Sequence, residues 1–187
     1  AFKSSNYTYF WIASLLSITS FFMLLIARGW LVFEITDSPF MVAAVAGVSQ
    51  LPSLVLSIFG GVIADRFNRK KILLMSEASN FIVLILLALL VAMDMIQVWH
   101  LLVLGLFNGV TFSLAFPARA AIVPSLVPTQ DIANAVALSS MMFSGAQLVG
   151  PAVVGVLLAI YVPSVAFFAA AGAVALAIPF FLALKLR

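Results

Sequence analysis

The chain alternates between long runs of apolar residues and short polar connections. The apolar runs cover residues 9–33, 40–64, 72–92, 98–116, 133–161 and 164–184. Each run is close to, or longer than, the roughly 20 apolar residues that a helix needs to cross a bilayer. The runs are too long and too continuous for the strands of a membrane barrel, which alternate over about ten residues. The pattern therefore predicts an all-α membrane protein with six transmembrane helices.

Short segments with proline or polar residues separate the runs. They are EITDSP at residues 34–39, MDMIQ at 93–97, VPTQD at 127–131 and YVPS at 161–164. Proline, aspartate and serine are common at turns and at helix starts. These segments support the helix count, and we treat residues 1–187 as one six-helix bundle.

The composition indicates that lipid surrounds the protein. Apolar residues make up 65% of the 187 residues and charged residues make up 8%, whereas soluble domains carry about 25% charged residues. A soluble fold of this length could not bury so much apolar surface. The first run is also too long for the apolar region of a cleaved signal peptide.

Basic residues outside the runs share one side of the predicted membrane protein. With six crossings, that side carries Lys3, Arg66, Arg69, Lys70, Lys71, Arg119, Lys185 and Arg187. The other side carries Glu34, Asp37 and Asp94. Because cytoplasmic loops are enriched in Lys and Arg, we expect both termini in the cytoplasm.

The residues do not indicate an enzyme, a metal site or a nucleic-acid-binding surface. The chain has no cysteine and one histidine, His100, so neither thiol chemistry nor a Cys/His metal site is expected. We find no Ser/His/Asp arrangement, no phosphate-binding loop and no basic stripe with interleaved aromatic residues. We therefore expect no cofactor, and an ion gradient as the source of energy.

Charge is concentrated in the connection between the second and third runs, GGVIADRFNRKKILL at residues 60–74. This segment is similar to the cytoplasmic loop signature of the major facilitator superfamily through Gly61, Asp65, Arg66, Arg69 and Lys70. Asn68 stands where that family usually has glycine. Asparagine is one of the few residues that tolerate a left-handed backbone, so we expect Asn68 to preserve the turn in that way.

Three further stretches resemble the drug and siderophore efflux branch of this superfamily, which includes macrolide-efflux and enterobactin-exporter relatives. They are SNYTYFWIAS at residues 5–14, FNGVTFSLAFPARAAIVPSLVP at 107–128 and LVGPAVVG at 148–155. The last stretch resembles the helix-five antiporter motif through Gly150, Pro151 and Gly155. It departs from the motif at Val154, where the family usually has the first of two glycines.

This resemblance implies the N-terminal half of a 12-helix transporter. Its six helices would form two inverted three-helix repeats. Its partner would be a C-terminal six-helix half or a second copy of the chain, and the sequence leaves both possibilities open. The loop would act as a cytoplasmic latch, in which Asp65 pairs with an arginine and meets a helix of the other half, while Gly61 allows close helix approach.

Polar residues within the runs are candidates for the transport path. Arg28 could bind an anionic group or pair with an acid, or its side chain could reach the outer surface. The other polar side chains could instead join neighbouring helices. Glu77 and Arg119 could form a charge network, or could be separate charges in interfacial water. The candidates for lining a central cavity are Arg28, Gln50, Asn108 and Gln147.

Small residues spaced four apart predict close helix packing. Such pairs occur at Gly105 and Gly109, and at Ala146 and Gly150. Pro151 follows Gly150 within the fifth run and predicts a kink, because proline removes a helical hydrogen bond.

Together these features predict a secondary active transporter in a bacterial cytoplasmic membrane. It would export an amphipathic small molecule, a drug or a siderophore, by alternating access coupled to proton entry. One alternative is transport of a lysophospholipid or another lipid-like substrate. Another is a non-transporting membrane scaffold with a half-transporter fold, although a static scaffold would gain nothing from a latch.

Overall fold

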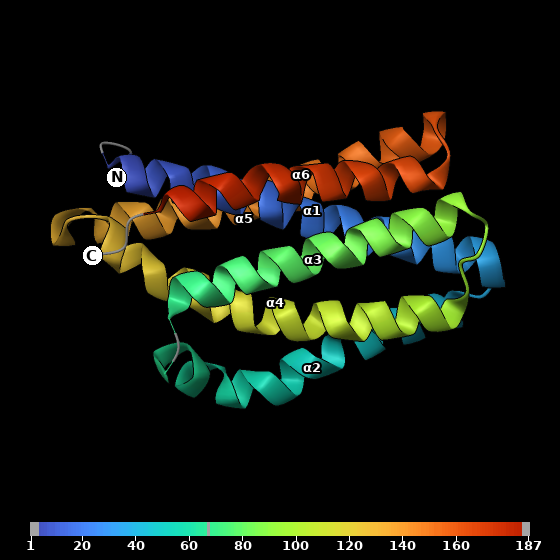
Figure 1. Ribbon diagram of the computed structural model, residues 1–187, viewed down its shortest axis with the longest axis horizontal. Coiled ribbons are helices and arrows are strands. Elements are labelled where there is room, and N and C mark those ends of the chain that lie inside the picture. Colours follow the sequence, from blue (N-terminus) through green and yellow to red (C-terminus); the bar gives the residue numbers. More distant parts are fainter. Residues whose placement is uncertain (1–3, 67, 185–187) are drawn as a thin grey trace.

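The computed structural model describes residues 4–66 and 68–184, and the side chains of residues 4–56 and 68–184. This part of the chain forms long helices joined by short connections (Figure 1). Six helices are long and apolar enough to cross a membrane, which confirms the predicted all-α membrane architecture. In chain order the elements are α1 (Ser5–Thr36), α2 (Pro39–Arg66), α3 (Arg69–Ala92), α4 (Val98–Leu126), the short 3-10 helix η1 (Thr129–Asp131), α5 (Ile132–Ile160) and α6 (Pro163–Ala183).

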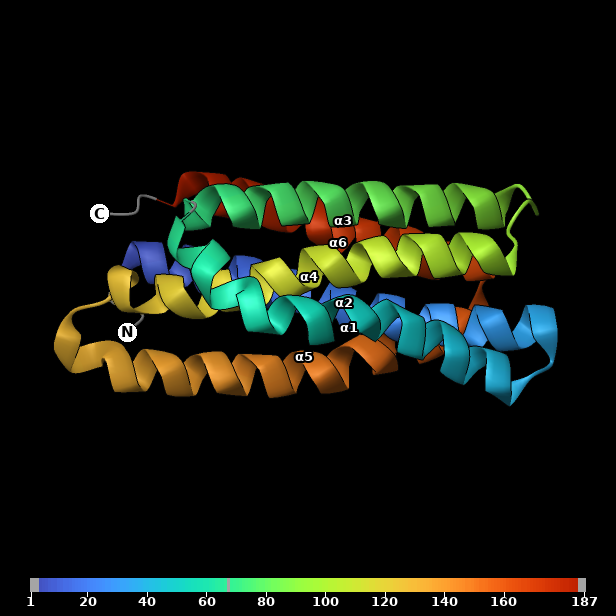
Figure 2. The ribbon, with the colours of Figure 1, turned by 90° about the horizontal axis from the view of Figure 1, so that it is seen from below.

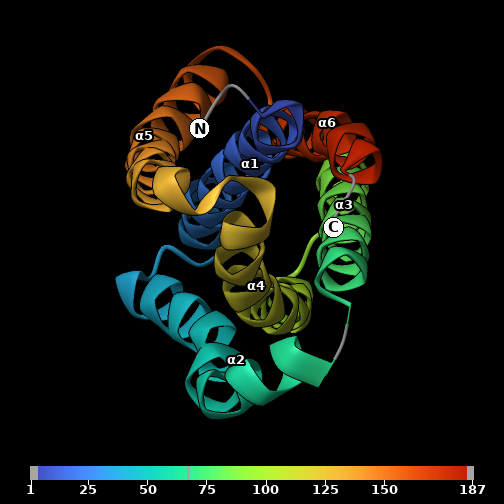
Figure 3. The ribbon, with the colours of Figure 1, turned by 90° about the vertical axis from the view of Figure 1, so that its left-hand side faces the viewer.

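Helix α1 occupies the centre of the bundle. It packs against α5 and α6, while α3 packs against α6 and α4, and α2 packs mainly against α4. Figure 2 shows α3 and α5 along opposite edges of the bundle, and Figure 3 shows the helix order seen along the bundle. Helix α1 begins and α6 ends at the same end (Figure 1), as an even number of crossings requires.

Helices α2 and α5 are the least covered. In their most apolar windows 17% of the residues are buried, compared with 56% in α1. Large apolar side chains on these two helices are exposed: Leu54 of α2 is 68% exposed and Leu148 of α5 is 76% exposed. In a membrane protein such faces meet lipid or another set of helices.

The core lies mainly between α1, α3, α4 and α6. Aromatic side chains contribute to this core, since the rings of Phe10 of α1 and Phe181 of α6 pack edge to face with centroids 6.4 Å apart. The Tyr7 hydroxyl donates to the Ala135 carbonyl oxygen at 2.8 Å and so joins α1 to α5. The largest fully buried side chains include Tyr7, Phe10, Leu24, Leu73, Leu84, Leu87, Ile122, Phe167 and Phe181.

Glycines bring α4 against α2 and α5 against α1. A Cβ atom on Gly109 would collide with the Ser49 carbonyl oxygen of α2. A Cβ atom on Gly150 would lie 2.8 Å from the Cβ of Phe22 on α1. Both small-residue pairs therefore occur where helices approach closely, as the sequence predicts.

The largest boundary difference is at the end of α4. The apolar run predicts an end near residue 116, but the helix continues through two prolines to Leu126. Each proline removes one helical hydrogen bond, yet Ala118, Ile122 and Leu126 lie one turn apart and are buried. Packing of this apolar stripe stabilises the extra turns. Arg119, which the sequence places outside the apolar run, consequently lies inside α4.

Asn68 begins α3 as its N-cap residue. Its backbone has φ −62° and ψ 110°, which is extended, so the expected left-handed conformation is wrong. Its side-chain oxygen accepts hydrogen bonds from the backbone N–H groups of Lys70 at 3.0 Å and Lys71 at 3.3 Å. Asparagine is a preferred N-cap residue because it satisfies donors at the helix start. The turn therefore uses the side chain of Asn68, and not a positive φ.

Candidate functional site

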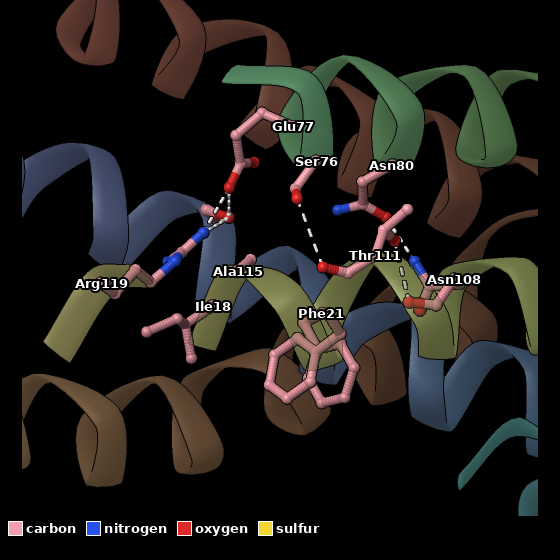
Figure 4. A pocket seen from close by; sticks show the side chains of 11 residues that line it. Ile18, Phe21, Ser76, Glu77, Asn80, Asn108, Thr111, Ala115 and Arg119 are labelled. Carbon is pink, nitrogen blue, oxygen red and sulfur yellow. Dashed lines mark hydrogen bonds and ion pairs between the residues drawn. The ribbon is translucent and has the colours of Figure 1, made fainter. Parts of the chain in front are cut away.

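A buried polar cluster joins α1, α3 and α4 (Figure 4). Arg119 of α4 forms an ion pair with Glu77 of α3, and Arg119 Nη2 also donates to the Ser17 hydroxyl of α1 at 2.6 Å. The Ser17 hydroxyl donates to Glu77 Oε1 at 2.6 Å. The side chain of Glu77 is 3% exposed and that of Arg119 is 13% exposed. These three groups therefore hold three helices together within an apolar bundle.

The cluster decides between the two sequence-based interpretations of Glu77 and Arg119. They form a buried pair and are not separate charges in interfacial water. Burial of both charges is costly unless each is well paired and hydrogen-bonded. Arg119 has a further contact, because its Cζ atom lies 5.5 Å from the ring centroid of Phe181 on α6, a cation–π geometry. Ser17 could not be predicted as a member of this cluster, because a serine within a long apolar run carries no sign of its partner.

A second polar group lies next to the ion pair, between α3 and α4. The side-chain nitrogen of Asn108 donates to Asn80 Oδ1 at 2.8 Å, and the Ser76 hydroxyl donates to the Thr111 carbonyl oxygen at 3.3 Å. With the ion pair, these residues line a small cavity of about 20 Å³, enough for about one water molecule. Asn108, a predicted cavity residue, thus joins two helices beside a very small polar space.

A larger space, which we call the α1–α4–α5 hollow, lies between those three helices. Its volume is about 410 Å³, within the range of about 300–1,000 Å³ typical of small-molecule sites. Arg119 lines both this hollow and the small cavity. The mixture of lining groups suits a ligand with an apolar ring system and a few polar atoms. The lining includes Phe10, Phe116, Met142, Phe143, Ser14, Ser139, Ser140 and Ser144.

Arg28 is buried elsewhere, between α1, α2 and α4. It is 5% exposed, so its side chain does not extend to an open surface. A Cβ atom on Gly105 of α4 would lie 2.5 Å from both Arg28 Nη1 and the Ser49 hydroxyl of α2. The absence of a side chain at Gly105 therefore makes room for the guanidinium. Among the described residues, no acidic side chain pairs with Arg28.

Gln50 and Gln147 lie on the two least covered helices. Gln50 is exposed on α2 and Gln147 is exposed on α5, and neither lines the α1–α4–α5 hollow. Their role in a central cavity stays a prediction, because such a cavity would need further helices opposite these faces.

Two basic residues at the start of α3 contact other helices of the same bundle. Arg69 Nη1 donates to the Ala121 carbonyl oxygen of α4 at 2.8 Å. Lys70 Nζ donates to the carbonyl oxygens of Leu182 at 2.8 Å and Leu184 at 2.6 Å. A cation is favourable at the C-terminal end of a helix such as α6. Sequence analysis missed these contacts, which give Arg69 and Lys70 a structural role.

The structure describes some of the remaining motif residues and leaves others outside the described part of the chain. The side chains of Asp65 and Arg66, and the surroundings of Gly61, lie outside the described residues, so the predicted latch stays a prediction. In α5, Gly150 packs against α1 and Pro151 lies inside the helix. Gly155 faces open space, because a Cβ atom there would have nothing within 4 Å.

Known proteins resemble the chain over most of its length. It is 27% identical to the Staphyloferrin A transporter of Staphylococcus aureus over 164 residues, which are 87% of this chain and 41% of that protein. It is 30% identical to the enterobactin exporter EntS of Citrobacter koseri over 151 residues, which are 79% of this chain and 36% of that protein. It is also 30% identical to the uncharacterized MFS-type transporter YfiS of Bacillus subtilis, over 75% of this chain and 33% of that protein.

The chain spans about two-fifths of the length of these relatives, or less, with shares of 41%, 36% and 33%. The family described as transmembrane secretion effector matches residues 1–185, which include all six membrane-length helices. The match agrees with the loop signature at residues 61–70 and with the proline-containing helices α4 and α5. Because it extends over almost every residue, the chain belongs to the transmembrane secretion effector family of the major facilitator superfamily, in the branch of the enterobactin exporters.

Proposed function

We propose that the chain forms the N-terminal half of a secondary transporter that exports amphipathic small molecules, of the drug or siderophore kind, across a bacterial cytoplasmic membrane. The observation that carries this proposal is the α1–α4–α5 hollow. It has the volume of a drug-sized site and combines aromatic, hydroxyl and guanidinium groups. The relatives named for staphyloferrin A and for enterobactin also favour a small-molecule substrate.

A second six-helix unit would complete this transporter. The least covered helices are α2 and α5, and the chain matches 41% of the Staphyloferrin A transporter. A C-terminal half, or a second copy of the chain, would cover these faces and enclose the hollow. The two units would then move against each other by alternating access, with both termini of this half in the cytoplasm and Asp65 at the contact between the units.

We also propose that proton entry drives export. Glu77 is a buried carboxylate that joins α3 to α4 through Arg119, and to α1 through Ser17. A proton on Glu77 would remove its charge and weaken the ion pair, so protonation could favour a different helix arrangement. The charged group facing Glu77 is Arg119; α1 contributes the uncharged Ser17, and the described residues of α6 include no ionisable side chain.

Inside-out membrane vesicles from cells that express the protein at its full native length test this function. The lumen is made acidic, so that protons leave it as substrate enters, and uptake of labelled enterobactin and staphyloferrin A is measured. Vesicles without the protein are the control. Uptake that a protonophore abolishes supports the proposal. Uptake that ignores the protonophore contradicts proton coupling, and no uptake of either compound contradicts siderophore export.

A fluorescent lysophospholipid, measured in the same vesicles, separates the alternative functions. Transfer of this lipid without uptake of either siderophore would replace the proposed substrate class with a lipid-like one. Failure of all three compounds to move would favour a non-transporting scaffold.

A further inference from the structure

Two buried donors at the α1–α4–α5 hollow have no partner among the described residues. They are Arg119 Nη1 and the Ser14 hydroxyl, and both residues line the hollow. Ser14 is 0% exposed. A buried donor without an acceptor costs free energy and is uncommon in folded proteins. These two atoms therefore mark a place where a ligand can accept hydrogen bonds.

The two donors belong to α1 and α4, which meet at Ser17 and Arg119. The Ser17 hydroxyl contacts Arg119 Nη2 at 2.6 Å, and Ser17 follows Ser14 by three residues within α1. Residues three apart lie on the same helix face, with Cβ atoms about 5–6 Å apart. Ser14 is thus one helical turn from the serine that touches the guanidinium, so both donors belong to the part of the hollow that α1 and α4 form.

The charge of the site selects the kind of polar group. Glu77 binds Arg119 through Nη2 and lines the small cavity but not the hollow. Glu77 therefore neutralises the guanidinium from the side of the small cavity. A second negative charge beside Arg119 would be repelled by Glu77 in surroundings of low dielectric constant. A neutral acceptor, such as the carbonyl oxygen of an ester or amide, can accept from both donors without this repulsion.

Three aromatic rings line the same hollow as these donors. Phe116 and Phe143 have centroids 6.1 Å apart in an edge-to-face arrangement, and both line the hollow together with Phe10. Rings in this arrangement offer faces and edges to a flat aromatic ligand, because aromatic pairs prefer offset or edge-to-face contacts. The two donors therefore share the hollow with three aromatic rings.

We propose that the hollow binds aromatic molecules through a neutral hydrogen-bond acceptor, which receives hydrogen bonds from Arg119 Nη1 and the Ser14 hydroxyl. Glu77 is a positioning residue that holds Arg119 and disfavours anionic ligand groups. This inference rests on the proposed transport function, because it names the substrate class of the same hollow. Binding, however, can be measured without transport.

Three anthracene probes that differ at one position test this inference. Methyl anthracene-9-carboxylate carries a neutral acceptor, anthracene-9-carboxylate carries a negative charge, and 9-methylanthracene carries neither. Dissociation constants are measured by fluorescence titration of the full-length protein in lipid nanodiscs at one pH, with empty discs subtracted. Each probe is compared with itself across protein variants, so that its partition into lipid cancels.

Ser14→Ala removes one donor and leaves the ion pair intact. We expect the dissociation constant of the ester to rise roughly three- to tenfold, the value of one net hydrogen bond, while that of 9-methylanthracene stays unchanged. Ser113→Ala is the matched control. Ser113 of α4 is not among the residues that line the hollow, and its hydroxyl donates to the Gly109 carbonyl oxygen at 2.7 Å, so all three probes should bind as they do to the wild type.

Glu77→Gln leaves the guanidinium charge uncompensated. We expect this variant to bind anthracene-9-carboxylate roughly tenfold or more tightly than the wild type does, because hydrogen bonds between charged groups are the stronger ones. Binding of the ester should change little. If Glu77→Gln does not fold, the comparison of Ser14→Ala with Ser113→Ala decides the question, because neither variant removes a member of the ion pair.

Two results would overturn the inference. One is ester binding that Ser14→Ala does not weaken. The other is a Glu77→Gln variant that folds but gains no affinity for the carboxylate. These results are distinct from a failure of the proposed function. The predicted binding pattern in a protein without flux contradicts transport alone, and flux with unaffected ester binding contradicts this site alone.

Discussion

Removal of either member of the Glu77–Arg119 pair should destabilise the bundle strongly. The side chains are 3% and 13% exposed, so each single substitution leaves a buried charge without its counter-charge. Breaking such a pair from one side costs about 3–5 kcal/mol. Coulomb's law gives a similar size, about 4 kcal/mol for unit charges about 4 Å apart at an effective dielectric constant of about 20.

A double-mutant cycle measures the interaction directly. Glu77→Gln and Arg119→Gln are each expected to lower the free energy of unfolding by about 3–5 kcal/mol. The double variant replaces the ion pair by two neutral amides that can bond to each other and to Ser17. We therefore expect it to lose no more stability than either single variant, which corresponds to a coupling energy of at least about 3 kcal/mol.

Unfolding by sodium dodecyl sulfate in mixed micelles, followed by circular dichroism, provides the free energies. Gln147→Ala, a substitution at an exposed position on α5, is the control and should change stability by less than about 0.5 kcal/mol. Losses that simply add in the double variant would refute the coupling. Single losses below about 1 kcal/mol would show that the two charges are not buried as a pair.

Three further predictions use the same unfolding assay. Gly150→Ala should lower the free energy of unfolding by about 1–3 kcal/mol, because the new Cβ atom would lie 2.8 Å from Phe22 Cβ. The control Gly145→Ala has nothing within 4 Å of its Cβ position, so its free energy of unfolding should stay unchanged or rise by up to about 1 kcal/mol. Equal effects of the two substitutions would argue against the close helix contact. Asn68→Ala should lower the free energy of unfolding by about 1 kcal/mol, because the N-cap hydrogen bonds are lost, whereas Asn68→Asp should keep them and leave stability unchanged. Unchanged stability of the alanine variant would show that the N-cap does not stabilise α3. Arg28→Met should keep or raise stability, because Arg28 is buried without an acidic partner among the described residues, and an unpaired buried charge is costly. Vesicle uptake should fall if a ligand or the second unit supplies the counter-charge, whereas a large loss of stability would show that this bundle itself needs the guanidinium.

Local features of the chain were sufficient to predict the helices. Each apolar run is long enough to cross a bilayer by itself, so its existence depends little on the other runs. Most helix ends lie within about one turn of their predicted positions. The end of α4 is different, because its last turns follow a proline and are stabilised by burial of Ala118 and Ile122 against other helices. That burial depends on contacts with other helices, so the local sequence pattern does not predict it.

Candidate site residues were predictable by type, and their partners were harder to predict. A charged residue within an apolar run stands out, so Arg28, Glu77 and Arg119 were all recognised. Pairing of Glu77 with Arg119 was one of two open alternatives, and Ser17 was missed altogether. Serines are common in membrane helices, and only the side chains opposite them determine which ones take part in a polar cluster.

Hydrophobic length and a short charged motif are local properties of the chain, so six membrane-length helices and the superfamily were predictable from the residues. The meeting of Ser17, Glu77 and Arg119, and the hollow between α1, α4 and α5 that Arg119 lines, depend on tertiary structure. These contacts join residues 42 to 102 positions apart. They depend on the relative rotation and spacing of packed helices. Close contacts at glycines and the burial of apolar helix faces set that arrangement together, so no single apolar run encodes it.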